Sequence, residues 1–205
     1  DEYATSSAEK ELEGMVMQAL ERSRTGGLVV EGTSGSTGIA LATLCAARGH
    51  ACLVVLPDDQ AVEKQRILRS LGAVVYEVPT AAISNPKHYV NLGRKAALLA
   101  REKFGVSAVF IDQFENLSNF DIHYSKTGPE LVRQLGKRGR RLDAFVMSSG
   151  TGGTISGMAT YLKEQYRRKG VEIVLVDPPG SSLYHKVEHG IAFATEQRER
   201  HLRKH

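Results

Sequence analysis

The sequence EGTSGSTG at residues 31–38 follows the apolar run LVV at 28–30 and leads into a helical pattern rich in Ala and Leu. A second stretch, SSGTGGTISG at residues 148–157, follows the apolar run AFVM at 144–147 in the same way. A glycine-rich turn between a strand and a helix leaves backbone N–H groups free, and the helix dipole adds partial positive charge there. Both loops are therefore predicted to bind anionic groups such as phosphates or carboxylates.

Around these loops, short apolar runs alternate with longer helical patterns along most of the chain. The predicted strands lie at 28–31, 51–56, 73–78, 106–111, 142–147 and 171–177. The predicted helices lie at 9–24, 37–48, 61–71, 86–104, 124–135 and 154–169. This alternation is typical of βαβ units, and right-handed crossovers then give a doubly wound, mostly parallel α/β fold. Ligands on such sheets bind beyond the carboxyl ends of the strands, where both loops are expected to lie.

Composition sets limits on the class of protein. The chain has 205 residues, of which 41% are hydrophobic and 24% charged, with a net charge of +4, and it lacks any apolar run near the ~20 residues that span a membrane. Much of the positive charge lies at 137–141 and 198–205, in a predicted turn and tail without interleaved aromatic residues. A nucleic-acid site needs basic residues and stacking aromatics on one face. We therefore predict neither a nucleic-acid partner nor a membrane partner.

Two features bear on the cell compartment and on metals. Cys45 and Cys52 lie in a helical and a strand pattern and are predicted to be buried hydrophobes without a disulfide, which fits a reducing compartment. We expect the cytoplasm, with the mitochondrion as the alternative because the chain does not begin with Met.

His185 and His189 have the i, i+4 spacing of metal ligands, but no third ligand accompanies them and no metal site is predicted.

Two common phosphate-binding signatures can be weighed against the loops. A Walker P-loop requires a lysine after its last glycine, and neither loop has one. A dinucleotide-binding turn requires G-x-G-x-x-G, which Gly150 and Gly152 begin but Ile155 interrupts. Asp177, after the next predicted strand, could take the place of the ribose-binding acid, so a nicotinamide cofactor stays open as an alternative.

A third interpretation comes from the order of several motifs. TSGSTG at 33–38, DQFEN at 112–116, HYSKTGPE at 123–130, GTGGTISG at 150–157 and VDPPGS at 176–181 follow one another. In this order they resemble the cysteine synthase (O-acetylserine sulfhydrylase) and cystathionine β-synthase family, particularly its fungal cysteine synthase-like branch. The resemblance implies pyridoxal 5'-phosphate as cofactor and the tryptophan synthase β-like fold, also called fold type II.

The resemblance also implies a domain organisation. A smaller α/β domain at 9–136 would carry the substrate-carboxylate loop, and a partial larger α/β domain at 137–205 would carry the cofactor phosphate loop. The family pattern continues on both sides of the motifs found here, so the chain is expected to be an internal fragment, incomplete at both ends.

Specific residues follow from the matched motifs. The cofactor-binding set implied is Gly150, Thr151, Gly152, Gly153, Thr154 and Ser36. The substrate-binding set implied is Thr33, Ser34, Gly35, Thr37 and Gln113. Ser36 departs from the family, which usually has Asn there. The family's Schiff-base lysine stands in a motif that this chain lacks, so Lys10 is the candidate within the chain and a lysine outside it is the alternative. His123 and Tyr124 are expected to pack and hydrogen-bond rather than to act as bases.

The implied activity is a β-replacement that forms cysteine from O-acetylserine or serine with sulfide or a thiol. Two alternatives stay open. The same apparatus could perform β-elimination, as in a cysteine desulfhydrase or a serine/threonine deaminase, or the chain could be a non-catalytic domain of this fold. The expected partners are a small amino-acid substrate, sulfide or a thiol, and a second copy in a homodimer.

Overall fold

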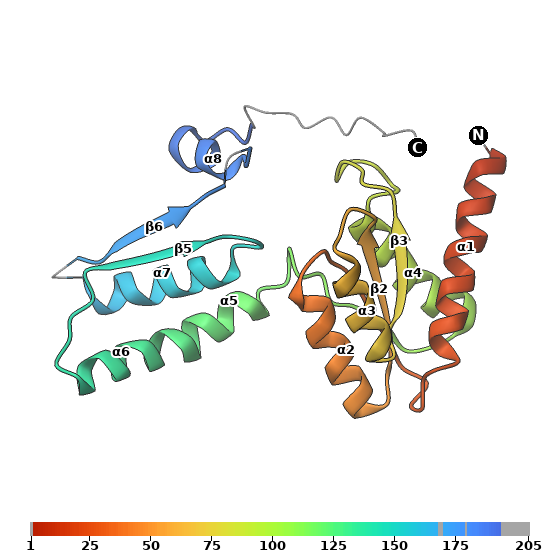
Figure 1. Cartoon of the computed structure of the whole chain (residues 1–205), viewed down its shortest axis with the longest axis horizontal. Helices are drawn as coiled ribbons and strands as arrows, with labels where there is room; N and C mark the ends of the chain where they lie inside the picture. The colour runs from red at the N-terminus through yellow and green to blue at the C-terminus, as the bar shows by residue number, and fades with distance from the viewer. Residues whose placement is uncertain (1, 168–169, 179, 194–205) are drawn as a thin grey trace. The chain divides into compact units, whose positions relative to one another are not determined.

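The computed structural model describes residues 2–167, 170–178 and 180–193, with side chains from residue 8 onward. It divides into two compact units, Asp1–Asn116 and Leu117–His205, which are described one at a time (Figure 1). The basic run at 198–205 and the last residues of the helix predicted to end at 169 lie outside the described residues. No helix in the described ranges is long and apolar enough to cross a membrane.

Unit 1 is built around a parallel sheet in the strand order β3-β2-β1-β4. The strands are β1 (Leu28–Gly32), β2 (Ala51–Pro57), β3 (Val74–Val78) and β4 (Ala108–Phe110). The helices are α1 (Glu2–Leu20), α2 (Ser36–Arg48), α3 (Val62–Ser70) and α4 (Tyr89–Phe104). The predicted alternation of strand and helix is therefore present, with α1 beginning before the expected residue 9.

Both faces of this sheet are covered, as parallel sheets require. The central strand β2 is buried along its whole length. Its side chains alternate, so that Leu53 and Val55 pack with α1 and α4 while Val54 and Leu56 pack with α2 and α3. Each such side chain contributes about 1.5–3 kcal/mol when it is fully buried. This core fixes the carboxyl ends of the strands, where the first glycine-rich loop begins.

The two cysteines belong to the cluster on the α2 and α3 face. Cys45 on α2 and Cys52 on β2 are both buried and free, and they pack with Ala42 and Val54. They serve there as small hydrophobic side chains.

Unit 2 contains the parallel pair β5 (Ala144–Ser148) and β6 (Glu172–Val176). Its helical elements are α5 (Ser118–Ile122), the π-helical turn η1 (His123–Thr127), α6 (Gly128–Lys137), α7 (Gly153–Gln165) and α8 (Leu183–His189). Glycines let α7 approach this stretch closely. A Cβ on Gly157 would come 2.5 Å from the Phe120 carbonyl oxygen, and one on Gly128 would come 2.5 Å from Tyr161 Cδ1.

These contacts give a division of the chain that differs from the predicted boundary between 136 and 137. The structure divides the chain after Asn116, because α5, η1 and α6 all pack against α7 and so join the second unit. Two elements also differ from the sequence prediction. The predicted helix at 124–135 extends back to Ser118 through the π-helical turn, and α8 forms where no helical period was recognised.

Candidate functional site

The first glycine-rich loop lies between the carboxyl end of β1 and the first turn of α2. Thr33 is 2% exposed, and its backbone N–H donates to the Val55 carbonyl at 3.0 Å. Its hydroxyl accepts a hydrogen bond from the Gly35 backbone N–H at 3.2 Å, which closes the turn. Gly35 caps α2 without a side-chain hydrogen bond, and the first turn of α2 holds no acidic residue. The free N–H groups and the helix dipole therefore make this turn suited to an anion.

Gln113 is brought to this loop from the segment that follows β4. Its side-chain amide donates to the Thr33 hydroxyl at 3.1 Å across 80 residues of sequence. Asp112, just before it, has a φ of 58°, a left-handed conformation that is uncommon for a residue other than glycine. An ion pair of 2.8 Å with Arg94 on α4 holds Asp112 in place. Gln113 and Thr33, which the family resemblance placed in one substrate-binding set, therefore contact each other.

Two side chains that the sequence did not point to hold Ser34. The Lys64 ammonium on α3 donates to the Ser34 carbonyl oxygen at 2.9 Å and to Gln60 at 3.3 Å. The Tyr89 hydroxyl, at the start of α4, hydrogen-bonds with the Ser34 side chain. Burial raises the pKa of Tyr89, and this hydrogen bond partly opposes the rise. The loop is therefore tied to α3 and to α4 at the same residue.

Lys64→Met should loosen the loop because it removes the ammonium donor and keeps most of the apolar stem. If this loop holds a substrate carboxylate as the sequence predicts, amino-acid affinity should fall about twofold to tenfold, the range of one net hydrogen bond, while cofactor affinity stays unchanged. Titration of each ligand into the purified protein measures both. Arg66→Met, on an exposed position of the same helix, is the matched control. Equal losses for Lys64→Met and Arg66→Met would remove the assigned role of Lys64.

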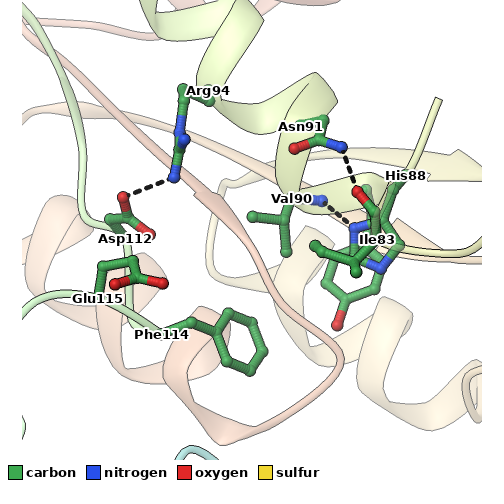
Figure 2. A pocket seen from close by; sticks show the side chains of 9 residues that line it. Ile83, His88, Val90, Asn91, Arg94, Asp112, Phe114 and Glu115 are labelled. Atoms are coloured by element: carbon green, nitrogen blue, oxygen red, sulfur yellow. Dashed lines mark hydrogen bonds and ion pairs between the residues drawn. The ribbon is translucent and has the colours of Figure 1, made fainter. Parts of the chain in front are cut away.

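A cavity of about 480 Å³ lies beside this loop, between the start of α4 and the turn at 112–115 (Figure 2). Tyr89 both lines the cavity and reaches Ser34, so the cavity and the loop share a wall. Arg94 and Asp112 form an ion pair in one part of its wall (Figure 2). Its lining residues are Ile83, His88, Tyr89, Val90, Asn91, Arg94, Asp112, Phe114 and Glu115. The wall holds apolar and charged groups in similar number.

The second glycine-rich loop, in unit 2, joins β5 to α7. Gly152 caps α7 with a φ of 89°, where a residue with a Cβ would be strained, and it makes no side-chain cap hydrogen bond. The first turn of α7 holds no acidic residue. A Cβ on Gly150 would meet no atom within 4 Å, so the outer side of the loop is open. Free N–H groups, an uncapped helix end and open space together fit a phosphate.

Side chains on α5 and η1 hydrogen-bond with the threonine hydroxyls of this loop. The Asn119 side-chain amide donates to the Thr151 hydroxyl at 3.2 Å, and His123 Nε2 lies 3.0 Å from the Thr154 hydroxyl. The other ring nitrogen of His123 lies 3.1 Å from the Thr127 hydroxyl. His123 therefore hydrogen-bonds on both sides, in line with the expected packing role, and both threonines are oriented by their neighbours.

The structure collects the predicted site residues into two groups. In unit 1 they occupy the first loop and its contacts: Thr33, Ser34, Gly35, Ser36, Thr37 and Gln113. In unit 2 they form the second loop: Gly150, Thr151, Gly152, Gly153 and Thr154. Lys10 lies on α1, in unit 1, with its side chain exposed.

The comparisons with known proteins identify the family of this chain. The family model for pyridoxal-phosphate dependent enzymes matches residues 5–203. The chain belongs to this family. Cysteine synthase 2 of Neurospora crassa is 46% identical over 179 residues, which are 85% of this chain and 38% of that protein. A Saccharomyces cerevisiae protein, provisionally named a mitochondrial cysteine synthase, is 45% identical over 87% of this chain and 45% of its own length.

A solved structure is similar as well. A hydrogen sulfide-producing enzyme of Fusobacterium nucleatum superposes with a TM-score of 0.67 at 27% identity, over 97% of this chain and 53% of that one. These matches confirm the predicted α/β fold of the tryptophan synthase β-like class and the resemblance to cysteine synthases. The chain spans less than half the length of the two curated relatives.

Proposed function

We propose that this chain carries the cofactor-phosphate loop and the substrate-carboxylate loop of a cysteine synthase-like enzyme that uses pyridoxal phosphate. The observation that carries the proposal is the pair of uncapped helix N-termini, at Gly35 and at Gly152, each free of acidic residues in its first turn. A substrate with a carboxylate and a cofactor with a phosphate supply the two anions that such a pair suits. Similarity to fungal cysteine synthases supports the reaction type.

Each loop has a stated task in this proposal. The backbone amides of Gly152, Gly153 and Thr154, with the Thr151 and Thr154 hydroxyls, would hold the cofactor phosphate. The loop at 33–37 and the Gln113 amide would hold the α-carboxylate, and Ser36 would face the cofactor ring. When bound, pyridoxal phosphate supplies an electron sink for charge that develops at the substrate α-carbon. The protein residues supply anion binding and orientation.

The lysine that would form the Schiff base with the cofactor is still to be assigned. Lys10 is the candidate among these residues, and a lysine beyond the 205 residues is the alternative. Borohydride treatment of the protein loaded with cofactor, followed by peptide mass spectrometry, identifies the labelled lysine. We expect the label on one lysine only. A label absent from Lys10 would remove that assignment without affecting the two loops.

The proposed reaction is β-replacement on O-acetylserine or serine with sulfide or a thiol, forming cysteine. The second candidate is β-elimination, favoured by the similarity to a hydrogen sulfide-producing enzyme. Parallel assays separate them, because replacement consumes sulfide and forms cysteine, whereas elimination from cysteine releases sulfide. We expect sulfide consumption that depends on O-acetylserine and on added cofactor. Net sulfide release from cysteine with no cysteine formation would favour elimination instead.

Cofactor binding is tested separately from turnover. Pyridoxal phosphate added to the purified chain should give a saturable change in absorbance, with one cofactor bound per chain. No saturable change would leave a non-catalytic domain of this fold as the explanation. We also propose that the protein forms a homodimer, which light scattering would check. We further propose a reducing compartment, either the cytoplasm or the mitochondrion, which localisation of the tagged protein would check.

A further inference from the structure

Glu31 is a buried carboxyl group that the proposed chemistry does not use. It is 1% exposed and lies on β1, two residues before Thr33. Alternation along the strand places Glu31 on the same face as Val29 and Thr33. Burying an ionisable group without a counter-charge costs free energy, so a carboxyl at this position needs a specific explanation.

The carboxyl group faces the backbone of the segment that carries Gln113. Parallel pairing sets Val30 opposite Phe110, so Glu31 lies beside the residues just after β4. The backbone amides of Gln113, Asp112 and Gly32 all favour its ionised form. In the described part of the chain, however, neither carboxylate oxygen has a hydrogen-bond partner of standard geometry. The contact is therefore an electrostatic one between a carboxylate and three backbone amide groups.

The turn that these amides belong to has a defined shape. Asp112 adopts its left-handed conformation, and its carbonyl accepts from the Asn116 N–H at 2.8 Å and the Glu115 N–H at 3.0 Å. The Arg94 guanidinium holds one oxygen of the Asp112 side chain. The carbonyl and the side chain of Asp112 are thus engaged, and the backbone groups of Asp112 and Gln113 that act on Glu31 belong to a fixed turn.

We propose that Glu31 is a positioning residue, whose carboxylate holds the Asp112–Gln113 backbone and thereby sets the Gln113 amide against Thr33. The inference rests on the proposed role of Gln113 in holding the substrate carboxylate. Glu31 acts through Gln113 and does not touch the substrate.

The charge state of Glu31 then matters near neutral pH. Burial raises the pKa of Glu31 to about 7, and the nearby Asp112 carboxylate adds to the rise. The charge of Glu31 also acts on the Tyr89 hydroxyl, and the Arg94 guanidinium forms an ion pair with Asp112. The attraction between a carboxyl group and nearby backbone N–H dipoles is stronger when the carboxyl group is ionised. The turn is therefore held more firmly as the pH rises through 7.

Binding of L-serine to the cofactor-loaded protein tests this role in four proteins: wild type, Glu31→Gln, Gln113→Ala and the double variant. We expect Glu31→Gln to lower L-serine affinity about twofold to tenfold at pH 8 and much less at pH 6. In the Gln113→Ala background the same change should have no further effect, because the two residues act as one unit. Tyr76→Phe, which removes a buried hydroxyl from β3, is the control and should behave like wild type. Additive losses in the double variant would overturn the proposal.

Amide hydrogen exchange gives a readout that does not depend on substrate. Protection of the Asp112 and Gln113 amides, corrected for intrinsic rates, should rise between pH 6 and pH 8 in the wild type and stay level in Glu31→Gln. If Gln113→Ala leaves L-serine affinity unchanged, Gln113 does not hold the substrate carboxylate. The exchange data would still test whether Glu31 holds the Asp112–Gln113 backbone. Equal protection in wild type and Glu31→Gln at pH 8 would overturn the positioning role of Glu31.

Discussion

Gly150→Asp is expected to weaken pyridoxal phosphate binding by about tenfold to a hundredfold, whereas Gly150→Asn should bind within about threefold of the wild type. The position suits the comparison because a Cβ there meets no atom within 4 Å and the backbone is not left-handed. The two variants are therefore matched in shape and differ in charge. A carboxylate about 5 Å from a phosphate costs roughly 1.5–3 kcal/mol at an effective dielectric constant between about 20 and 40.

Absorbance titration in a phosphate-free buffer measures the two affinities. The defect of Gly150→Asp should shrink as salt is added, since the repulsion acts through solvent and is screened. The left-handed Gly152 is a less informative position, because any side chain there brings backbone strain as well as its own charge. Equal affinities for the Asp and Asn variants at low salt would mean that the phosphate does not bind at this loop.

The sequence predicted the parts of the fold that depend on local patterns. The fully apolar β2 could be recognised as a central buried strand, and Gly49 and Gly105, which end α2 and α4 in left-handed conformations, marked the helix ends correctly. Both glycine-rich loops could be recognised because glycine and threonine between a strand and a helix form a short, local signal. Gln113 was reached only through the family resemblance, and the structure shows its contact with Thr33.

Elements that depend on tertiary contact were missed. The segment at 118–123 lacks a clear apolar period, and its helical form goes with the close approach of α7 at Gly157, 34 or more residues away. The same reason applies to the domain boundary, because the helices before residue 137 join unit 2 by packing on α7. Lys64 could not be linked to Ser34 either, since the contact joins a helix side chain to a loop carbonyl across 30 residues.

Glu31 was also missed, because a single acidic residue at a strand end carries no local signal of its burial. Its effect on stability should nevertheless be large. The folded-state pKa of about 7 is above the ordinary value of 4.5, so between these pH values the folded protein holds a proton that the unfolded chain has released. The free energy of unfolding therefore falls as the pH rises from 4.5 to 7, by about 3 kcal/mol from this group.

Glu31→Gln should remove that loss, because the amide has nearly the same shape and never ionises. We expect the variant to match the wild type near pH 4.5 and to be more stable at pH 8, by up to about 3 kcal/mol. Urea unfolding followed by far-ultraviolet circular dichroism at several pH values measures the difference. Glu115→Gln, an exposed carboxylate on the neighbouring turn, should stay within about 0.5 kcal/mol of the wild type throughout.

Glu31→Gln is expected to raise the stability of the protein and to lower its affinity for the substrate. Because these effects have opposite signs, they separate two explanations for the buried carboxylate. A carboxylate that only destabilised the folded protein at neutral pH would leave substrate binding unchanged when replaced by an amide. A carboxylate that positions Gln113 should lower substrate affinity in the same pH range where its replacement raises stability. Parallel pH–stability curves for wild type and Glu31→Gln between pH 4.5 and pH 8 would show that burial does not raise the pKa of Glu31, and a change in its hold on the turn near pH 7 would then be lost as an explanation.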